Sequence, residues 1–240
     1  MLKLVGFDAD DTLWHSEGFY RAVHDEFEKI LGHYLDLGNA NVHEHLLDTE
    51  RRNIKLFGYG AKGMTLSMLE TAIALTDESI SAKHLHEIMT LGKEVLSHPV
   101  QLIDGIAQAV SEVAKEYQIV LITKGDLFHQ ESKVARSGLL AAFGRIEIVS
   151  EKDPATYQRV LSEFGLSAQQ FLMVGNSLRS DISPVLQIGG YAVHMPYPLT
   201  WALEHDEQFI ADEHRMLSVD SASQIPPAVH QLALKAARIH

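Results

Sequence analysis

Two aspartates, Asp8 and Asp10, directly follow the first hydrophobic segment of the chain. Residues 2–7 are mostly apolar and typical of a buried strand, so the sequence changes abruptly from apolar to acidic side chains. Two carboxylates this close repel each other in a partly dry site unless a divalent cation or a bound proton compensates their charge. The simpler alternative is that Asp10 or Asp11 only caps a following helix. The spacing therefore indicates either a reactive site that binds a cation or a proton, or a helix cap. Motifs later in the chain distinguish these two interpretations.

Beyond residue 97 the sequence alternates between short apolar runs and amphipathic helical patterns. Because the apolar runs are continuous and short, we expect strands buried on both faces. Strands are predicted at 119–123, 146–149, 171–174 and 191–195. Strands alternating with helices form a doubly wound parallel sheet, in which ligands bind at the carboxyl ends of the strands.

Polar side chains follow three of these strands and could join the two aspartates at one edge of the sheet. They are Thr123 and Lys124, then Lys152, then Asn176 and Asp181. Each one alone could be a helix cap or a solvated loop residue. Together they suit phosphoryl transfer, because a carboxylate can attack phosphorus and a second carboxyl can move the proton. A lysine and a hydroxyl stabilise the phosphoryl charge, and oxygen ligands suit Mg²⁺.

These residues make the chain similar to the haloacid dehalogenase superfamily of phosphohydrolases. Four motifs occur in the family's order: the D-x-D-x-T of Asp8–Thr12, Thr123 at a strand end, Lys152 before a helix, and the stretch Gly175–Asp181. Motif matches gain weight when their structural context agrees. The resemblance implies a Rossmann-like α/β core with an all-helical cap domain inserted between the first two motifs.

The resemblance also implies a role for each motif residue. Asp8 would be the nucleophile, and Asp10 would be the general acid and base, with its backbone carbonyl also bound to Mg²⁺. Thr123 and Lys152 would bind the phosphoryl group, and Lys152 would also neutralise Asp8. Asp181 would be a further metal ligand beside Asp8 and Asp10.

Two positions depart from the family pattern. Asn176 stands where the family often has aspartate; its amide oxygen can still bind a hard cation, so we expect weaker metal binding rather than none. Lys124 stands where the family often has asparagine. It could add positive charge at a phosphate-binding position, or it could point to solvent.

The domain organisation follows from a change in periodicity. Residues 16–96 show apolar side chains at helical spacing, interrupted by glycines, and no strand pattern. We therefore predict a catalytic core of residues 1–15 and 97–240, and a helical cap of residues 16–96. Trp14 and His15 would lie near the junction, either lining the pocket or packing against cap helices.

The predicted function is hydrolysis of a small phosphorylated metabolite by a Mg²⁺-dependent phosphatase, through an aspartyl-phosphate intermediate. Asp10 favours this chemistry over dehalogenation, because a halide needs no proton on leaving whereas an alkoxide does. A phosphomutase of the same superfamily, and a non-catalytic regulator that binds a phosphorylated ligand, are the alternatives. The motifs do not separate the phosphatase from the phosphomutase, whereas the presence of all four motifs argues against the non-catalytic regulator.

Composition limits the partners and the location. The net charge of −12 argues against nucleic acid as a partner, because no basic surface is available to replace counterions. The chain has no cysteine, which excludes disulfides and thiolate metal sites. No signal sequence and no apolar run long enough for a membrane span are evident, so a cytoplasmic protein without a membrane partner is predicted.

The sequence does not predict the oligomeric state. The pairs His43/His45 and His84/His86 are interpreted as surface histidines.

Overall fold

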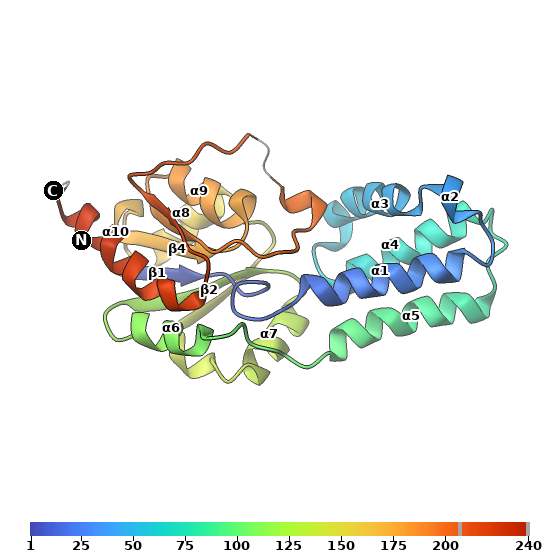
Figure 1. The fold of residues 1–240 in the computed structure, drawn as a ribbon, viewed down its shortest axis with the longest axis horizontal. Helices are drawn as coiled ribbons and strands as arrows, with labels where there is room; N and C mark the ends of the chain where they lie inside the picture. The colour runs from blue at the N-terminus through green and yellow to red at the C-terminus, as the bar shows by residue number, and fades with distance from the viewer. Residues whose placement is uncertain (206–207, 239–240) are drawn as a thin grey trace. The chain divides into compact units, whose positions relative to one another are not determined.

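The computed structural model describes residues 1–205 and 208–238 (Figure 1). The strands are β1 (Leu4–Phe7), β2 (Gln118–Lys124), β3 (Arg145–Val149), β4 (Phe171–Gly175), β5 (Tyr191–His194) and β6 (Met216–Ser218). The longer helices are α1 (Glu17–Leu31), α3 (Val42–Phe57), α4 (Ala61–Leu75), α5 (Ala82–Ser97), α6 (Ile106–Val113), α7 (Leu127–Arg136), α8 (Pro154–Glu163) and α10 (Ile225–Arg238). Short helices and turns are α2 (Leu37–Ala40), η1 (Leu140–Ala142), η2 (Ala168–Gln170), η3 (Leu178–Ile182), α9 (Ser183–Gln187), η4 (Ala202–Glu204) and η5 (Ala222–Gln224).

The six strands form one sheet in the order β3-β2-β1-β4-β5-β6, and every neighbouring pair is parallel. Strand β1 therefore lies at the centre, between β2 and β4, with Phe7 in register with Leu121 and Val174. All carboxyl ends point the same way, so the segments that follow β1, β2 and β4 meet at one edge. The α/β fold with a doubly wound parallel sheet predicted from the sequence is confirmed.

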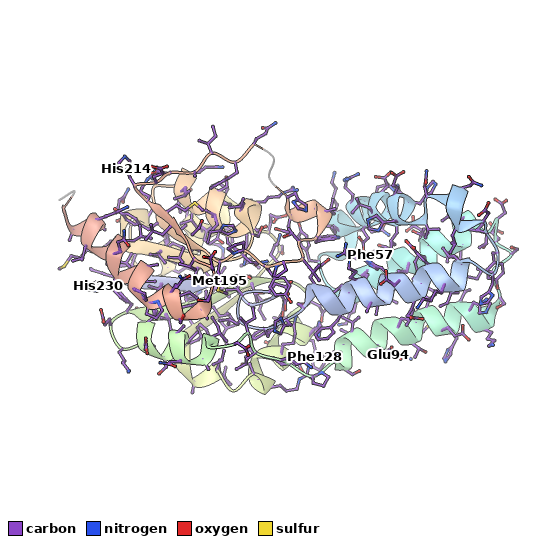
Figure 2. All side chains as sticks on the ribbon, viewed as in Figure 1. Phe57, Glu94, Phe128, Met195, His214 and His230 are labelled. Atoms are coloured by element: carbon purple, nitrogen blue, oxygen red, sulfur yellow. The ribbon has the colours of Figure 1, made fainter. Side chains whose placement is uncertain are left out.

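Helices cover both faces of the sheet because successive strand residues point to opposite sides. Val5 and Phe7 of β1 pack in one apolar core with α6 and α10, whereas Leu4 packs in another with α8 and α9. Figure 1 shows α8 and α9 on one side of the strands and α6 on the other. Met195, labelled in Figure 2, directly follows β5 and extends the first core. Continuous apolar strands are the sequence requirement for such two-sided burial.

The chain divides into two compact units. The core unit comprises Met1–His15, Val100–Lys124 and Gln130–His240, and contains the sheet. The helical unit comprises Ser16–Pro99 and Gly125–His129, and its longer helices pack around their own apolar core. Phe27, Leu31, Met68 and Ile88 are fully buried there. That the helical unit acts as a cap domain stays a prediction.

Helix α7 ends at Arg136, two residues before Gly138, which adopts a left-handed backbone conformation with φ of 75°. Two local features differ from the sequence interpretation. Strand β6 was not expected, because its three residues are too short for a period-2 pattern to show. The short segment 125–129 belongs with the helical unit rather than with the sheet. Among the described residues, no helix combines the length and apolar character needed to cross a bilayer.

Candidate active site

Asp8 directly follows β1 and lies in a buried position at the carboxyl edge of the sheet. Its backbone N–H donates to the carbonyl of Val174 at 2.9 Å, which extends the pairing with β4 by one residue. The Thr12 hydroxyl donates to Asp8 Oδ2 at 3.0 Å, and the Lys152 ammonium donates to Asp8 Oδ1. Both oxygens of the carboxylate are therefore held by donors.

Lys152 neutralises two carboxylates at once. It follows β3, at the start of the turn before α8, and it is 4% exposed. Its Nζ also lies 2.7 Å from Asp181 Oδ1. Burial and the negative charge of Asp181 raise the pKa of Asp8 from 3.8 to about 7, against the lowering effect of Lys152. Burial lowers the pKa of Lys152, but the charges of Asp181 and Asp8 outweigh it and raise the pKa overall. Around Lys152, one ammonium group thus faces two carboxyl groups.

Asp10 is held in a tight turn after β1. The Ala9 carbonyl accepts from the backbone N–H groups of Thr12 at 3.2 Å and Leu13 at 2.7 Å. Asp11 at the centre of the turn has a left-handed backbone conformation, with φ of 61°. Aspartate tolerates that conformation better than most residues. The turn directs the Asp10 side chain to a different set of partners from those of Asp8.

Three side chains donate to the Asp10 carboxylate. Lys133 Nζ lies 2.6 Å from Oδ1 and 2.8 Å from Oδ2. The Trp14 indole donates to Oδ1 at 2.6 Å, and Gln130 Nε2 donates to Oδ2 at 2.8 Å. Burial disfavours the ionised form, but the charge of Lys133 and the three donors outweigh burial, so the pKa of Asp10 is lowered from its ordinary value. These contacts therefore fix the position of the Asp10 carboxyl and favour its ionised form while no substrate is bound.

Thr123 lies within β2, one residue before its end, and is fully buried. Its Oγ accepts a hydrogen bond from Gln130 Nε2 at 3.2 Å. Because Gln130 also donates to Asp10, one amide group links the two predicted catalytic positions. Thr123, Asp8 and Asp10 thus come from adjacent strand ends, as the parallel order predicts.

The segment after β4 brings Asn176 and Asp181 into the site. A π-helical turn, η3, returns the chain so that Asp181 Oδ2 accepts the Ser177 backbone N–H at 3.0 Å. Gly175 is required here, since a Cβ at that position would lie 2.3 Å from Asp181 Oδ2. Asn176 Oδ1 is 3.2 Å from the Thr12 hydroxyl, which also contacts Asp8. The hydroxyl hydrogen can serve only one of these acceptors at a time.

The Lys124 side chain is directed to Glu204 and Ser180 and not to open solvent. Its ammonium lies 2.6 Å from Glu204 Oε1 and 2.9 Å from Ser180 Oγ. Glu204 Oε2 also accepts from the hydroxyls of Ser177 and Ser180, at 2.6 and 2.5 Å. Burial raises the pKa of Glu204, but Lys124 and these hydroxyls lower it overall. Besides the pairs of Lys152 and Lys133, the site therefore includes a partly buried pair of Lys124 with Glu204, which the sequence interpretation missed.

The donor set suits a hard divalent cation. Among residues 1–205 and 208–238, no three His, Asp or Glu side chains form a ready-made metal site. The candidate ligands are instead two carboxylates, Asp8 and Asp181, together with the Asn176 amide oxygen and the Asp10 backbone carbonyl. All are oxygen ligands of the kind Mg²⁺ prefers. The excess negative charge around Asp8 is what a bound cation would offset.

Comparisons with known proteins agree with this arrangement. A family model described as haloacid dehalogenase-like hydrolase matches residues 2–189. A crystal structure of a haloacid dehalogenase-like family hydrolase from Xanthomonas campestris shares 53% identity, covers 100% of this chain and 95% of that chain, and has a TM-score of 0.90.

Two further relatives are more distant and differ in chemistry. N-acylneuraminate-9-phosphatase from Mus musculus is 24% identical over 197 residues, which are 78% of this chain and 79% of the relative. A 2-haloacid dehalogenase from Pseudomonas syringae pv. tomato is 20% identical, covers 96% of this chain and 99% of that chain, and has a TM-score of 0.62. The last likeness concerns the fold alone. The chain belongs to the haloacid dehalogenase-like hydrolases.

Proposed function

We propose that the protein is a Mg²⁺-dependent phosphatase that hydrolyses a small phosphorylated metabolite through a phosphorylated Asp8. The observation that carries the proposal is the pairing of a buried Asp8, held by Lys152, with a second carboxyl at Asp10. A dehalogenase needs the first group but not the second, because its halide leaves without a proton. Because the chain is similar both to a phosphatase and to a dehalogenase, the residues of the site are the basis for preferring phosphatase activity.

The two carboxyl groups divide the reaction between them. An Asp8 oxygen attacks phosphorus, the bond from phosphorus to the leaving oxygen breaks, and that oxygen takes a proton from the Asp10 carboxyl. In the second half, a water oxygen attacks the phosphorus of phosphorylated Asp8, the bond from phosphorus to the Asp8 oxygen breaks, a water proton passes to the Asp10 carboxylate, and inorganic phosphate is released. Asp10 thus regains the proton that it gave to the leaving oxygen. The negative charge of a bound phosphate would favour the protonated form of Asp10 at the start of the cycle, against the contacts that favour ionisation in the empty site.

The remaining residues stabilise charge. Lys152 and the Thr123 hydroxyl would bind the phosphoryl oxygens. Asp8, Asp181, Asn176 and the Asp10 backbone carbonyl would hold Mg²⁺, which supplies positive charge to the phosphoryl group and reduces repulsion from Asp8.

The helical unit is proposed as the cap that selects substrates, with sugar phosphates and nucleoside monophosphates as candidates. The cytoplasmic location stays a prediction from the sequence.

The proposal is tested by product analysis with wild type and Asp8→Asn. We expect wild type to release inorganic phosphate from p-nitrophenyl phosphate and from one or more members of a panel of phosphorylated metabolites. Chelation should stop this release, and Ca²⁺ should not restore it, because Ca²⁺ prefers more ligands at longer distances. Asp8→Asn should be inactive, since an amide cannot attack phosphorus.

Three other results would point to the alternatives. Chloride release from 2-chloropropionate without phosphatase activity would identify a dehalogenase. Transfer of the phosphoryl group to a second hydroxyl, with little free phosphate, would identify a phosphomutase. Binding of a phosphorylated ligand with no turnover would identify a regulator.

A further inference from the structure

Two buried residues on α7, Gln130 and Lys133, have no role in the chemistry described above. They are three residues apart on one helix and therefore lie on the same face. Gln130 is 2% exposed and Lys133 is 7% exposed. A lysine is buried this far in proteins almost only when it is paired. Helix α7 follows β2 in the chain, and this position brings both side chains into contact with Asp10.

Lys133 spans both oxygens of the Asp10 carboxylate, at 2.6 and 2.8 Å. Contact with both oxygens fixes the rotation of the carboxylate as well as its position. The Asp10 side chain is nevertheless 30% exposed, against 9% for that of Lys133. One side of the carboxyl is thus held by the protein while another stays open to an approaching molecule.

The Gln130 amide nitrogen lies within hydrogen-bond distance of three acceptors, which share its two hydrogens. Its Nε2 lies 2.8 Å from Asp10 Oδ2, 3.2 Å from Thr123 Oγ and 2.6 Å from the Lys124 carbonyl. Its Oε1, in contrast, is buried without a hydrogen-bond partner among the described residues. Leaving a buried acceptor unsatisfied costs stability. A glutamine retained only for packing would not require that orientation, whereas one that aligns Asp10 with Thr123 would.

We infer that Lys133 and Gln130 are positioning residues that hold the Asp10 carboxyl at the point where the leaving oxygen and, later, the attacking water meet it. The inference rests on the proposed phosphatase function. A general acid must lie within hydrogen-bond reach of the atom it protonates. Asp10 stands on a turn outside the sheet, so its side chain needs partners from another element. Helix α7 supplies two of them, and Trp14 from the turn itself supplies the third.

The test compares leaving groups that differ in their need for a proton. An alkyl phosphate requires protonation of its leaving oxygen, whereas the 2,4-dinitrophenolate ion leaves without it. We measure kcat/KM of wild type, Lys133→Met, Lys133→Arg, Gln130→Leu and Asp10→Asn on propyl, p-nitrophenyl and 2,4-dinitrophenyl phosphate. Arg136→Met is the matched control, because Arg136 is an exposed cation on the same helix.

The expected result is a loss that depends on the leaving group. Lys133→Met should lower kcat/KM about 100-fold on propyl phosphate but by less than about threefold on 2,4-dinitrophenyl phosphate, with the loss in kcat rather than in KM. Gln130→Leu should show the same trend more weakly. Lys133→Arg should recover most of the propyl phosphate activity, because it retains a donor and a charge. Arg136→Met should match wild type.

The contrary outcomes separate this inference from the proposed function. Equal losses on all three esters in Lys133→Met, with Asp10→Asn still dependent on the leaving group, would show that the Lys133–Asp10 pair is only structural. A wild type that hydrolyses none of the esters, or an Asp10→Asn variant insensitive to the leaving group, would instead overturn the proposed role of Asp10 and with it the role of its partners.

Discussion

Lys152 and Asp181 form a fully buried ion pair, with Nζ 2.7 Å from Oδ1, and the same ammonium group also donates to Asp8. Replacing Lys152 with methionine leaves two buried carboxylates without their shared cation. Removing one partner of a buried pair costs about 3–5 kcal/mol. We therefore expect Lys152→Met to lower the free energy of unfolding by about that amount and to abolish turnover, which urea denaturation and a phosphate-release assay would measure.

A more specific test compares the stability of Lys152→Met with and without Mg²⁺. If Asp8 and Asp181 are metal ligands, Mg²⁺ should restore part of the stability of Lys152→Met, because it binds the folded state alone. Lys83→Met is a suitable control, since the Lys83 side chain is 79% exposed. A Lys152→Met protein as stable as wild type without Mg²⁺ would contradict the charge balance described for the site.

Asn176→Asp should strengthen Mg²⁺ binding. The amide oxygen lies 3.2 Å from the Thr12 hydroxyl that also contacts Asp8, which places it beside the nucleophile. A carboxylate there adds a negative ligand, but it also repels a phosphate dianion. We expect the Mg²⁺ concentration for half-maximal activity to fall, with turnover unchanged or lower.

The matched control makes the same change from amide to acid at Gln187, an exposed position on α9. Gln187→Glu should leave the Mg²⁺ dependence of wild type unaltered. An Asn176→Asp protein with an unaltered Mg²⁺ dependence and an intact fold would place Asn176 outside the metal site.

The sequence predicted where the candidate site residues lie in the fold better than it predicted the side chains that contact them. Asp8, Thr123 and Asp181 follow or end parallel strands, and parallel strands bring their carboxyl ends to one edge wherever the helices lie. Strand order therefore decides most of the site. Lys152 contacts both Asp8 and Asp181, so these three motif residues meet at one edge of the sheet as that reasoning implies.

The partners of Asp10 could not be predicted in the same way. Lys133 is 123 positions away in the sequence, and the geometry of α7 alone decides whether it reaches the turn after β1. The sequence feature that could have identified these partners is the spacing of Gln130 and Lys133, three residues apart on the helix that follows the strand containing Thr123. Glu204 gave no signal, because its turn, η4, has only three residues and is too short to show a periodic pattern.

The stability of the protein should depend on pH through His24 in α1. Burial, and secondarily the charge of His43, lower its pKa from 6.5 to about 4. Between these values the unfolded chain binds a proton that the folded chain does not, so stability is present above pH 6.5 and is lost as the pH falls toward 4. We expect a loss on the order of 3 kcal/mol over this range.

Urea unfolding at a series of pH values measures this loss. The variant His24→Gln should remove its contribution and give a flatter profile than wild type below pH 6.5. His45→Gln, on the exposed side of α3, should retain the wild-type profile. Parallel profiles for wild type and His24→Gln would contradict the assigned burial of a neutral histidine.

The central claim is that Asp8 carries the phosphoryl group during turnover. Asp10→Asn should slow the release of that group more than its formation from 2,4-dinitrophenyl phosphate, because the leaving phenolate needs no proton whereas the attacking water must lose one. Acid quenching of this variant in Mg²⁺, followed by peptide mass spectrometry, should find one phosphoryl group on the peptide that contains Asp8, and none in Asp8→Asn. Steady hydrolysis by wild type with no phosphoryl group on Asp8 in the quenched variant, or with the group on another residue, would contradict the account.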